Sequence, residues 1–316
     1  MLGDVDGDFN TLKLQAERLT ELRSELARRI ACFVGTAERL ATPVPRLSLH
    51  RRTEPTVPCP VTYEPSVIVI PQGRKQVDLG TKSFFYDATR YLLTSVDLPI
   101  ASRVLEASEQ TPCLAMMLKL EISTVRELLG REDIPMATAA HADRPAMGTA
   151  ETTVVLLDAC CRLVGLLETP RDIPFLSALI EREIVYRVLQ GPEGARLRAI
   201  ATLGDQSHRT ARAIAWLREN FARPVKVEEV AEVAGMGVST LHHHFRALTS
   251  MSPLQYQKQM RLHTARARML VDGIDAAGAA FEVGYESASQ FNREYSRMFG
   301  QPPMRDVRLA RGSAEA

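Results

Sequence analysis

The sequence predicts a multidomain α+β protein, with a small sheet or barrel in its N-terminal half and an all-α C-terminal domain. Three observations support this fold class. Short apolar runs separated by turn residues lie between Arg46 and Leu120, helical periodicity flanks them on both sides, and a helix-turn-helix pattern occurs twice near the C-terminus. A chain of 316 residues is long enough for two domains that each bury a core.

The composition is that of an ordinary globular protein, with 45% hydrophobic and 24% charged residues. No run approaches the ~18 apolar residues that a membrane span requires, and the acidic stretch Met1–Asn10 does not resemble a secretory signal. The five cysteines show no C-x-x-C spacing, so we expect a reducing, cytoplasmic location. The net charge of +1 means that any surface for nucleic acid must be a local basic patch.

Residues 1–40 are predicted to form an amphipathic helix and a linker. Apolar residues recur at helical spacing from Thr11 to Val34, with arginine and glutamate between them. Gly35 follows this run, and two prolines lie within Ala41–Arg46. The helix should therefore end near Gly35.

Residues 41–150 are predicted to be rich in short strands. Apolar, β-prone runs occur at Val67–Ile70, Tyr91–Leu93 and Leu114–Leu118, and glycine or proline lies between them. This spacing favours a small sheet or barrel. The stretch Leu128–Ala150 mixes glycine and proline with apolar residues, so we expect helix ends and loop there.

Residues 151–204 return to helical periodicity, first from Thr152 to Glu168 and then from Pro174 to Gln190. The first of these helices carries an apolar stripe that is either core or a dimer seam. The stripe comprises Leu156, Leu163, Leu166 and Leu167. A domain boundary is expected near Gly204, so that residues 205–316 form the last domain.

The segment Val227–Thr249 has the pattern of a helix-turn-helix. Ala231 is small where two helices must cross closely, and Gly235 suits the left-handed conformation that ends a helix. In the second helix, Leu241 and Phe245 share one face with Leu248. The polar residues opposite that face can contact base edges and phosphates, and they are Ser239, Thr240, His242, His243 and Arg246.

The pattern returns in Ala276–Gly300, where Phe291, Tyr295 and Phe299 share one face. The residues left outside that face are Ser287, Ser289, Gln290, Asn292, Arg293 and Arg297. A long helix over Pro253–Leu270 separates the two units and could place both reading helices in successive major grooves, ~34 Å apart. The alternative for these polar residues is an ordinary solvated helix face.

Two other interpretations of reactive side chains are weaker. The run His242-His243-His244 could suggest a metal, but adjacent residues of a helix point about 100° apart and cannot converge on one ion. Cys59 and Cys113 lie near predicted strands and are interpreted as small buried hydrophobic residues, with thiol sensing as the alternative. We expect no metal and no cofactor.

Residues from about Ser207 to Val307 resemble the AraC/XylS family of bacterial transcription regulators. The resemblance is carried by Gly284-Tyr285-Glu286-Ser287, Ser289-Gln290-Phe291, Arg293-Glu294-Tyr295 and Phe299-Gly300-Gln301-Pro302-Pro303. Upstream motifs resemble the sensor domain of one subgroup of that family. They are Arg51-Arg52-Thr53-Glu54-Pro55, Tyr63-Glu64-Pro65-Ser66, Gln72-Gly73-Arg74-Lys75 and Leu98-Pro99.

This resemblance implies a cupin-like β-barrel with flanking helices at 41–150, a helical dimerisation and linker region at 151–204, and a DNA-binding domain at 205–316. It implies a sequence-specific regulator, an activator more than a repressor, modulated by a small molecule bound in the N-terminal domain. The implied partners are double-stranded DNA, a small-molecule effector, a second copy of the chain and RNA polymerase, without a membrane.

One departure concerns His243, which stands where many relatives have an arginine. A histidine cannot make the bidentate contact to guanine that arginine makes, so base choice there is open.

Two alternatives to a regulator remain at this point. One is a barrel-based enzyme fused to a DNA-binding module, which would need a converging catalytic cluster within Arg46–Leu129, where none is evident. The other is a DNA-binding scaffold without a ligand.

Overall fold

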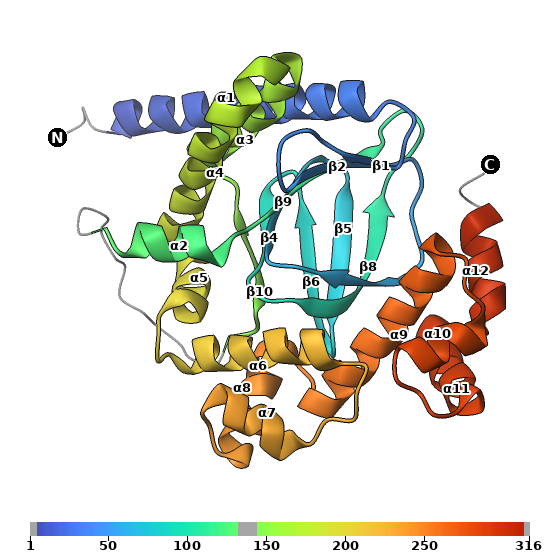
Figure 1. The fold of residues 1–316 in the computed structure, drawn as a ribbon. Helices are drawn as coiled ribbons and strands as arrows, with labels where there is room; N and C mark the ends of the chain where they lie inside the picture. Colours follow the sequence, from blue (N-terminus) through green and yellow to red (C-terminus); the bar gives the residue numbers. More distant parts are fainter. Residues whose placement is uncertain (1–4, 132–143, 313–316) are drawn as a thin grey trace.

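Two antiparallel sheets form the N-terminal half of the computed structural model, which describes residues 5–131 and 144–312 (Figure 1). One sheet has the strand order β1-β2-β9-β4-β7-β10 and the other has the order β3-β8-β5-β6. The strands are β1 Arg39–Ala41, β2 Leu47–Arg52, β3 Cys59–Tyr63, β4 Ser66–Gln72, β5 Arg74–Leu79, β6 Lys82–Asp87, β7 Arg90–Thr94, β8 Leu98–Glu106, β9 Cys113–Lys119 and β10 Met147–Glu151. We call this part the two-sheet domain. The predicted strand-rich region is confirmed.

The two sheets face each other, and side-chain alternation decides which residues lie between them. Burial and the positive charge of Lys75 in β5 lower the pKa of His50 in β2 to about 3, so His50 points toward the opposite sheet. Since successive residues of a strand point to opposite faces, Leu47 and Leu49 point outward. Both leucines are buried there, because the helix α1 packs on β2, β4 and β9.

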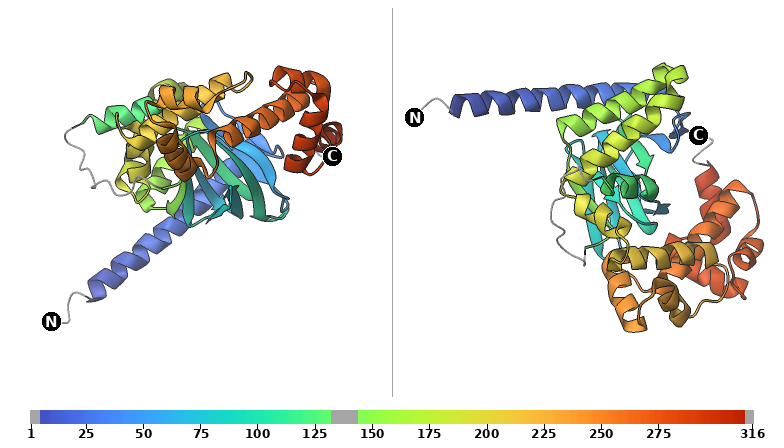
Figure 2. Two further views of the ribbon diagram at one scale, coloured as in Figure 1. Left: turned by 90° about the horizontal axis from the view of Figure 1, so that it is seen from below. Right: turned by 60° about the vertical axis from the view of Figure 1, so that its left-hand side comes forward.

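Helix α1 (Val5–Val34) begins earlier than predicted and ends where Gly35 takes a positive φ of 59°. Its C-terminal half is buried at Leu22, Leu26 and Ile30, whereas its N-terminal half extends beyond the rest of the molecule (Figure 2). The other helices of this half are α2 Ile122–Leu129, α3 Val154–Gly165, α4 Ile173–Gln190 and α5 Gly194–Ala201, with short 3₁₀ turns at Leu166–Glu168 and Pro170–Asp172.

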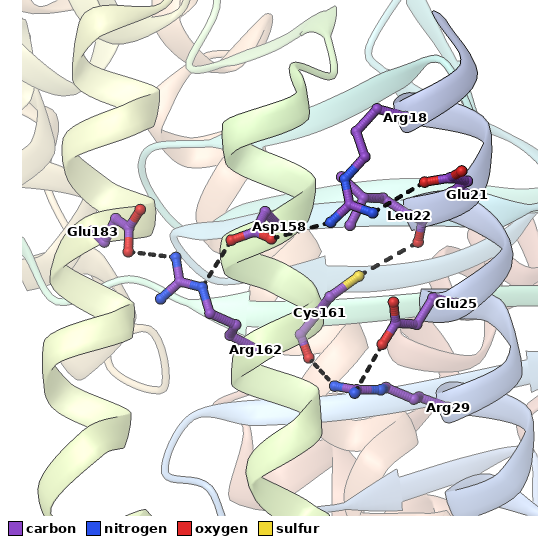
Figure 3. Close-up of polar contacts among 9 residues, drawn as sticks. All are labelled: Arg18, Glu21, Leu22, Glu25, Arg29, Asp158, Cys161, Arg162 and Glu183. Atoms are coloured by element: carbon purple, nitrogen blue, oxygen red, sulfur yellow. Dashed lines mark hydrogen bonds and ion pairs between the residues drawn. The ribbon is translucent and has the colours of Figure 1, made fainter. Parts of the chain in front are cut away.

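Helix α3 lies between α1 and α4, and polar contacts join the three helices (Figure 3). Arg29 of α1 donates to the carbonyl oxygen of Cys161 at 2.7 Å, and the Cys161 thiol donates to the carbonyl oxygen of Leu22 at 3.4 Å. Arg162 of α3 reaches Glu183 of α4 at 2.6 Å. The apolar stripe of α3 lies inside this arrangement.

That stripe is core and not a dimer seam. Leu156, Leu163 and Leu166 are buried within the single chain, and Leu167 is partly buried against the same core. A periodic apolar stripe only shows that one helix face is covered, and here α1 and α4 of the same chain cover it.

The prediction of helix ends and loop for Leu128–Ala150 is wrong at its C-terminal end, while residues 132–143 lie outside the described residues. Met147–Glu151 forms β10, which pairs with β7 along its whole length. Gly148 weakens any strand signal, but a Cβ at this position would lie 2.2 Å from the Glu193 carboxylate. The glycine therefore lets the strand approach α5, and tertiary pairing outweighs the weak local propensity.

The C-terminal part is all-α, as predicted. Its helices are α6 Gln206–Asn220, α7 Val227–Ala234, α8 Val238–Thr249, α9 Pro253–Val271, α10 Ala276–Glu282, α11 Ala288–Phe299 and α12 Pro303–Gly312. Gly235 ends α7 with a φ of +65°, which confirms the left-handed position expected for it. Ser252 begins α9 in a capping box with Gln255. Throughout the parts of the chain that the structure describes, every helix is too short or too polar to cross a membrane.

Candidate nucleic-acid interface

The first helix-turn-helix unit consists of α7 and α8. Val230 and Ala231 of α7 are buried against Leu241 and Phe245 of α8, and the Phe245 ring meets the ring of Tyr256 in α9 edge to face at 5.6 Å. This packing turns the other face of α8 to solvent. The predicted contact residues on it are all exposed, and they are Ser239, Thr240, His242, His243 and Arg246.

The second helix-turn-helix unit consists of α10 and α11. Phe291 and Tyr295 are fully buried, while Phe299 is partly buried on the same face. The predicted contact residues of this unit are again exposed, and they are Ser287, Ser289, Gln290, Asn292, Arg293 and Arg297. Ser287 is the N-cap of α11, where its hydroxyl oxygen accepts a hydrogen bond from the Gln290 backbone at 3.3 Å.

Three arginines lie on the two exposed faces. Among residues 5–131 and 144–312, no carboxylate forms an ion pair with Arg246, Arg293 or Arg297. Gln290 is less free, because its amide donates to the Glu294 carboxylate at 3.3 Å. An unpaired guanidinium on an exposed helix face can bind phosphate or a base edge without first breaking an ion pair.

Gly284 fixes the turn of the second unit in a way that the first unit does not share. It has a φ of +87°, and a Cβ there would lie 1.6 Å from the Ala222 carbonyl oxygen. Arg261 of α9 joins the two segments, donating to the carbonyl oxygens of Phe221 at 2.7 Å and Gly284 at 2.9 Å. The glycine of the family motif is therefore required both by its conformation and by a close backbone approach.

A second set of contacts that sequence reasoning missed holds α11 to α12 and α9. Asp306 accepts hydrogen bonds from Arg266 at 2.7 Å and from the Tyr295 hydroxyl at 2.7 Å. Burial and the neighbouring carboxylate raise the pKa of Tyr295, so its hydroxyl stays protonated and donates. In the sequence, these contacts were indicated only by Tyr295, a tyrosine on the otherwise apolar face of α11.

The helices on either side of the first unit, α6 and α9, are joined to the two-sheet domain at Asp97. Its buried carboxylate accepts a hydrogen bond from Arg218 of α6 at 2.7 Å, and its backbone carbonyl accepts one from the Tyr256 hydroxyl at 3.0 Å. Burial raises the pKa of Asp97, and Arg218 opposes that shift. Nearby, the Ala146 backbone donates to the carbonyl oxygen of Leu248 in α8 at 2.8 Å.

Three cavities among the described residues lie outside the space between the two sheets. One of about 560 Å³ lies beside α8, one of about 490 Å³ lies among α1, α3 and α4, and a small one lies where Ser95 meets α5 and α6.

The space between the sheets holds polar side chains. Tyr86 is fully buried, and burial together with the neighbouring Tyr63 hydroxyl raises its pKa. Burial raises the pKa of Cys113, which disfavours the thiolate that a reactive sensor needs. Cys59 is half-buried.

Among the described residues, no three His, Cys, Asp or Glu side chains gather as metal ligands would.

Two families match the chain by sequence. One is described as the AraC-type transcriptional regulator N-terminus and matches residues 43–196, and the other is a helix-turn-helix domain that matches residues 230–308. Among curated proteins, the chain is 29% identical over 153 residues to the HTH-type transcriptional activator RhaS of Salmonella schwarzengrund, covering 48% of this chain and 53% of RhaS. It is 30% identical over 151 residues to RhaS of Salmonella arizonae, with the same coverage. The chain thus spans about half the length of the curated relatives that it matches.

Solved structures show the same fold at low identity. Apo ToxT from Vibrio cholerae superposes with a TM-score of 0.56 and 10% identity, over 83% of this chain and 97% of ToxT. Wild-type ToxT bound to an unsaturated fatty acid superposes with a TM-score of 0.56 and 10% identity, over 86% and 95%. The two family matches account for most of the chain, and both HTH units and the two-sheet domain have the expected places in it. The chain belongs to the AraC/XylS family of transcription regulators.

Proposed function

We propose that this protein is a sequence-specific DNA-binding transcription regulator that acts in the cytoplasm, with α8 and α11 as its reading helices. The observation that carries the proposal is the doubled geometry. Each helix buries an apolar face with at least one aromatic ring against its own unit. It turns to solvent polar residues that include at least one arginine without an ion-pair partner among the described residues. The single long helix α9 joins the units, as a rigid spacer between two major-groove readers would.

The test is selection of duplex DNA from a random pool by the full-length protein, followed by gel-shift titration of the selected site. Replacing Arg293 with Ala should weaken binding by about 1–3 kcal/mol and relax the preference at one base position. Arg28→Ala is the control, because Arg28 is an exposed arginine of α1, on the far side of the two-sheet domain (Figure 1). Failure to enrich any duplex would refute the function, whereas full affinity in Arg293→Ala would refute only the role of α11.

We propose further that the protein activates transcription beside RNA polymerase and that an acidic, partly apolar molecule modulates it. The name of RhaS includes activator, and one ToxT structure contains an unsaturated fatty acid. In this chain, burial and the charges of Lys75, Arg39 and Arg52 lower the pKa of His50 to about 3. The positive charges of Lys75 and Arg39 near a buried histidine, with the buried hydroxyls of Tyr86 and Tyr63, favour a carboxylate ligand, whereas Arg52 is already paired with Glu38.

Calorimetric titration with oleate tests this effector class. Saturable binding by the wild type and at least tenfold weaker binding by Lys75→Met are expected, because the variant lacks the ammonium group but keeps a side chain of similar length. Lys119→Met is the matched control, since Lys119 is already paired with Glu64 at 2.8 Å. Equal binding by all three proteins would show that the carboxylate does not meet Lys75.

Finally, we propose that the protein dimerises through α4 rather than through the stripe of α3. The N-terminal half of α4 exposes Phe175, Leu176 and Leu179, with Phe175 at 73% exposure, beside the cavity of about 490 Å³. An isologous pairing would let the Phe175 ring of one copy fill the hollow of the other. Leu179→Lys should shift sedimentation from dimer to monomer, whereas Leu203→Lys, at an exposed leucine outside α4, should not.

A further inference from the structure

The hairpin of β5 and β6 reaches the first reading helix. Its two-residue turn, Gly80-Thr81, lies against the C-terminal end of α8. A Cβ at Gly80 would lie 2.8 Å from the Cβ of Ser250, which is the left-handed C-cap of α8. The close approach of the two backbones means that the tip of the hairpin has a defined place beside the helix.

A cavity of about 560 Å³ opens between the hairpin and α8. Its lining residues are Thr81, Lys82, His242, His243, Arg246, Ala247 and Ser250. Three of them, His242, His243 and Arg246, belong to the candidate DNA interface, and Lys82 comes from the two-sheet domain. None of the described residues that line the cavity is acidic. Its surface therefore continues the basic face of α8 onto another domain.

Lys82 is placed to present its charge at that surface. It pairs with Leu79 across the hairpin, and Leu79 is fully buried, so the lysine stem begins on the apolar side of the strand. The side chain is nevertheless exposed, and among the described residues no carboxylate forms an ion pair with it. A long basic side chain of this kind covers apolar surface with its stem and holds its ammonium group in solvent.

We infer that Lys82 contacts a backbone phosphate of the DNA that α8 reads, so that the two-sheet domain forms part of the DNA interface. The inference rests on the proposed function. A major groove is flanked on both sides by phosphates, and a basic wall beside the reading helix meets one of them. Such a contact adds affinity without sequence preference, and it depends on the position of the hairpin relative to α8.

The experiment is a salt titration of DNA binding, measured by fluorescence anisotropy with full-length protein from roughly 50 to 200 mM KCl. In Lys82→Gln, the slope of log K against log[KCl] should become shallower by about 0.9, the release of one counterion. Affinity at 0.1 M KCl should fall by about five- to tenfold, equally for the selected site and for an unrelated duplex. Lys82→Arg should retain the wild-type slope.

Lys13→Gln is the matched control, because Lys13 is an exposed lysine of α1, remote from α8 (Figure 1). An unchanged slope in Lys82→Gln, or tighter binding, would overturn the inference while leaving the proposed function intact. A wild type that binds no duplex would overturn the proposed function itself. A thermal melt checks that Lys82→Gln is folded, as expected for an exposed side chain.

Discussion

The two helix-turn-helix units share one pattern but have different surroundings. In the first, Val230, Leu241 and Phe245 belong to the same apolar core cluster as the strands of the two-sheet domain. In the second, Phe291 and Tyr295 belong to a separate cluster with residues of α9, α10, α12 and the turn before α11, and Phe221 packs against both clusters. One unit is thus continuous with the N-terminal half, and the other has a core of its own.

This difference means that the two readers are positioned by different contacts. Ala146 and Gly80 contact α8 of the first unit, and Asp97 holds the flanking helices α6 and α9. Arg261 and Asp306 instead join the second unit to other helices of the C-terminal part. A change in the two-sheet domain would reach the first reader directly. It would reach the second unit through α9, which contacts β3 and β8, and through α11, which contacts β3. A shift of the two-sheet domain would therefore alter the spacing between α8 and α11.

The largest expected effect is a difference in stability between alanine variants of Gly284 and Gly235, the glycines in the turns of the two units. Gly284→Ala should cost at least about 3 kcal/mol, because its Cβ would meet the Ala222 carbonyl oxygen in addition to the strained φ. Gly235→Ala should cost only about 1–2 kcal/mol, since nothing lies within 4 Å of its Cβ position. Hydrogen exchange should show loss of protection in α10 to α12 for the first variant alone.

If both variants are equally stable, the close approach at Gly284 does not constrain the second unit. The comparison would then reduce to two equivalent left-handed caps.

A smaller effect is expected where the first unit meets the two-sheet domain. Arg218→Ala leaves the Asp97 carboxylate buried and without its cation, which should cost about 1–3 kcal/mol in urea unfolding. Asp97→Asn should cost less, because an amide oxygen still accepts from Arg218 and no charge is buried. The double variant should recover most of the loss of Arg218→Ala.

The pH dependence of the same variant has a defined sign. Burial raises the pKa of Asp97 in the folded protein above its ordinary value, so this group favours folding while it is protonated. Its contribution is present at acidic pH and is lost as the pH rises through the raised pKa. Arg218→Ala removes the opposing cation, and its deficit relative to wild type should therefore be smaller at acidic pH than at pH 7. A deficit that grows on acidification would contradict this account.

The smallest effect concerns the starts of the two reading helices. Ser287 caps α11 with its side chain, whereas Gly237 at the start of α8 makes no side-chain cap. Ser287→Ala should destabilise the protein by ~1 kcal/mol, and Gly237→Ser should stabilise it by about 0.3 kcal/mol. Thermal melts of both variants test this. Gly237→Ala serves as the control without a hydroxyl, and stabilisation by that variant would show that capping is not the cause.

The sequence by itself determined the parts of this protein that depend on local order. Helix α9 and the two helix-turn-helix segments begin and end within a few residues of their predicted limits, because caps, glycines and 3.6-residue periodicity act over one or two turns. Helix α12 was not predicted. The outward position of Arg293 and the burial of Phe291 follow from the same periodicity. The strand-rich character of the N-terminal half and the family motifs were equally visible.

Tertiary structure alone decided which elements cover the apolar face of each helix and which residues far apart in the sequence come into contact. The α3 stripe was equally compatible with core and dimer seam until α1 was found against it. Strand β10 exists because β7 pairs with it, despite Gly148. Arg218 lies 121 residues from Asp97, and Tyr256 lies 159 residues from it. Local pattern carries no information on such pairs, since the chain between them can close in many ways and only the packing of the whole fold selects one.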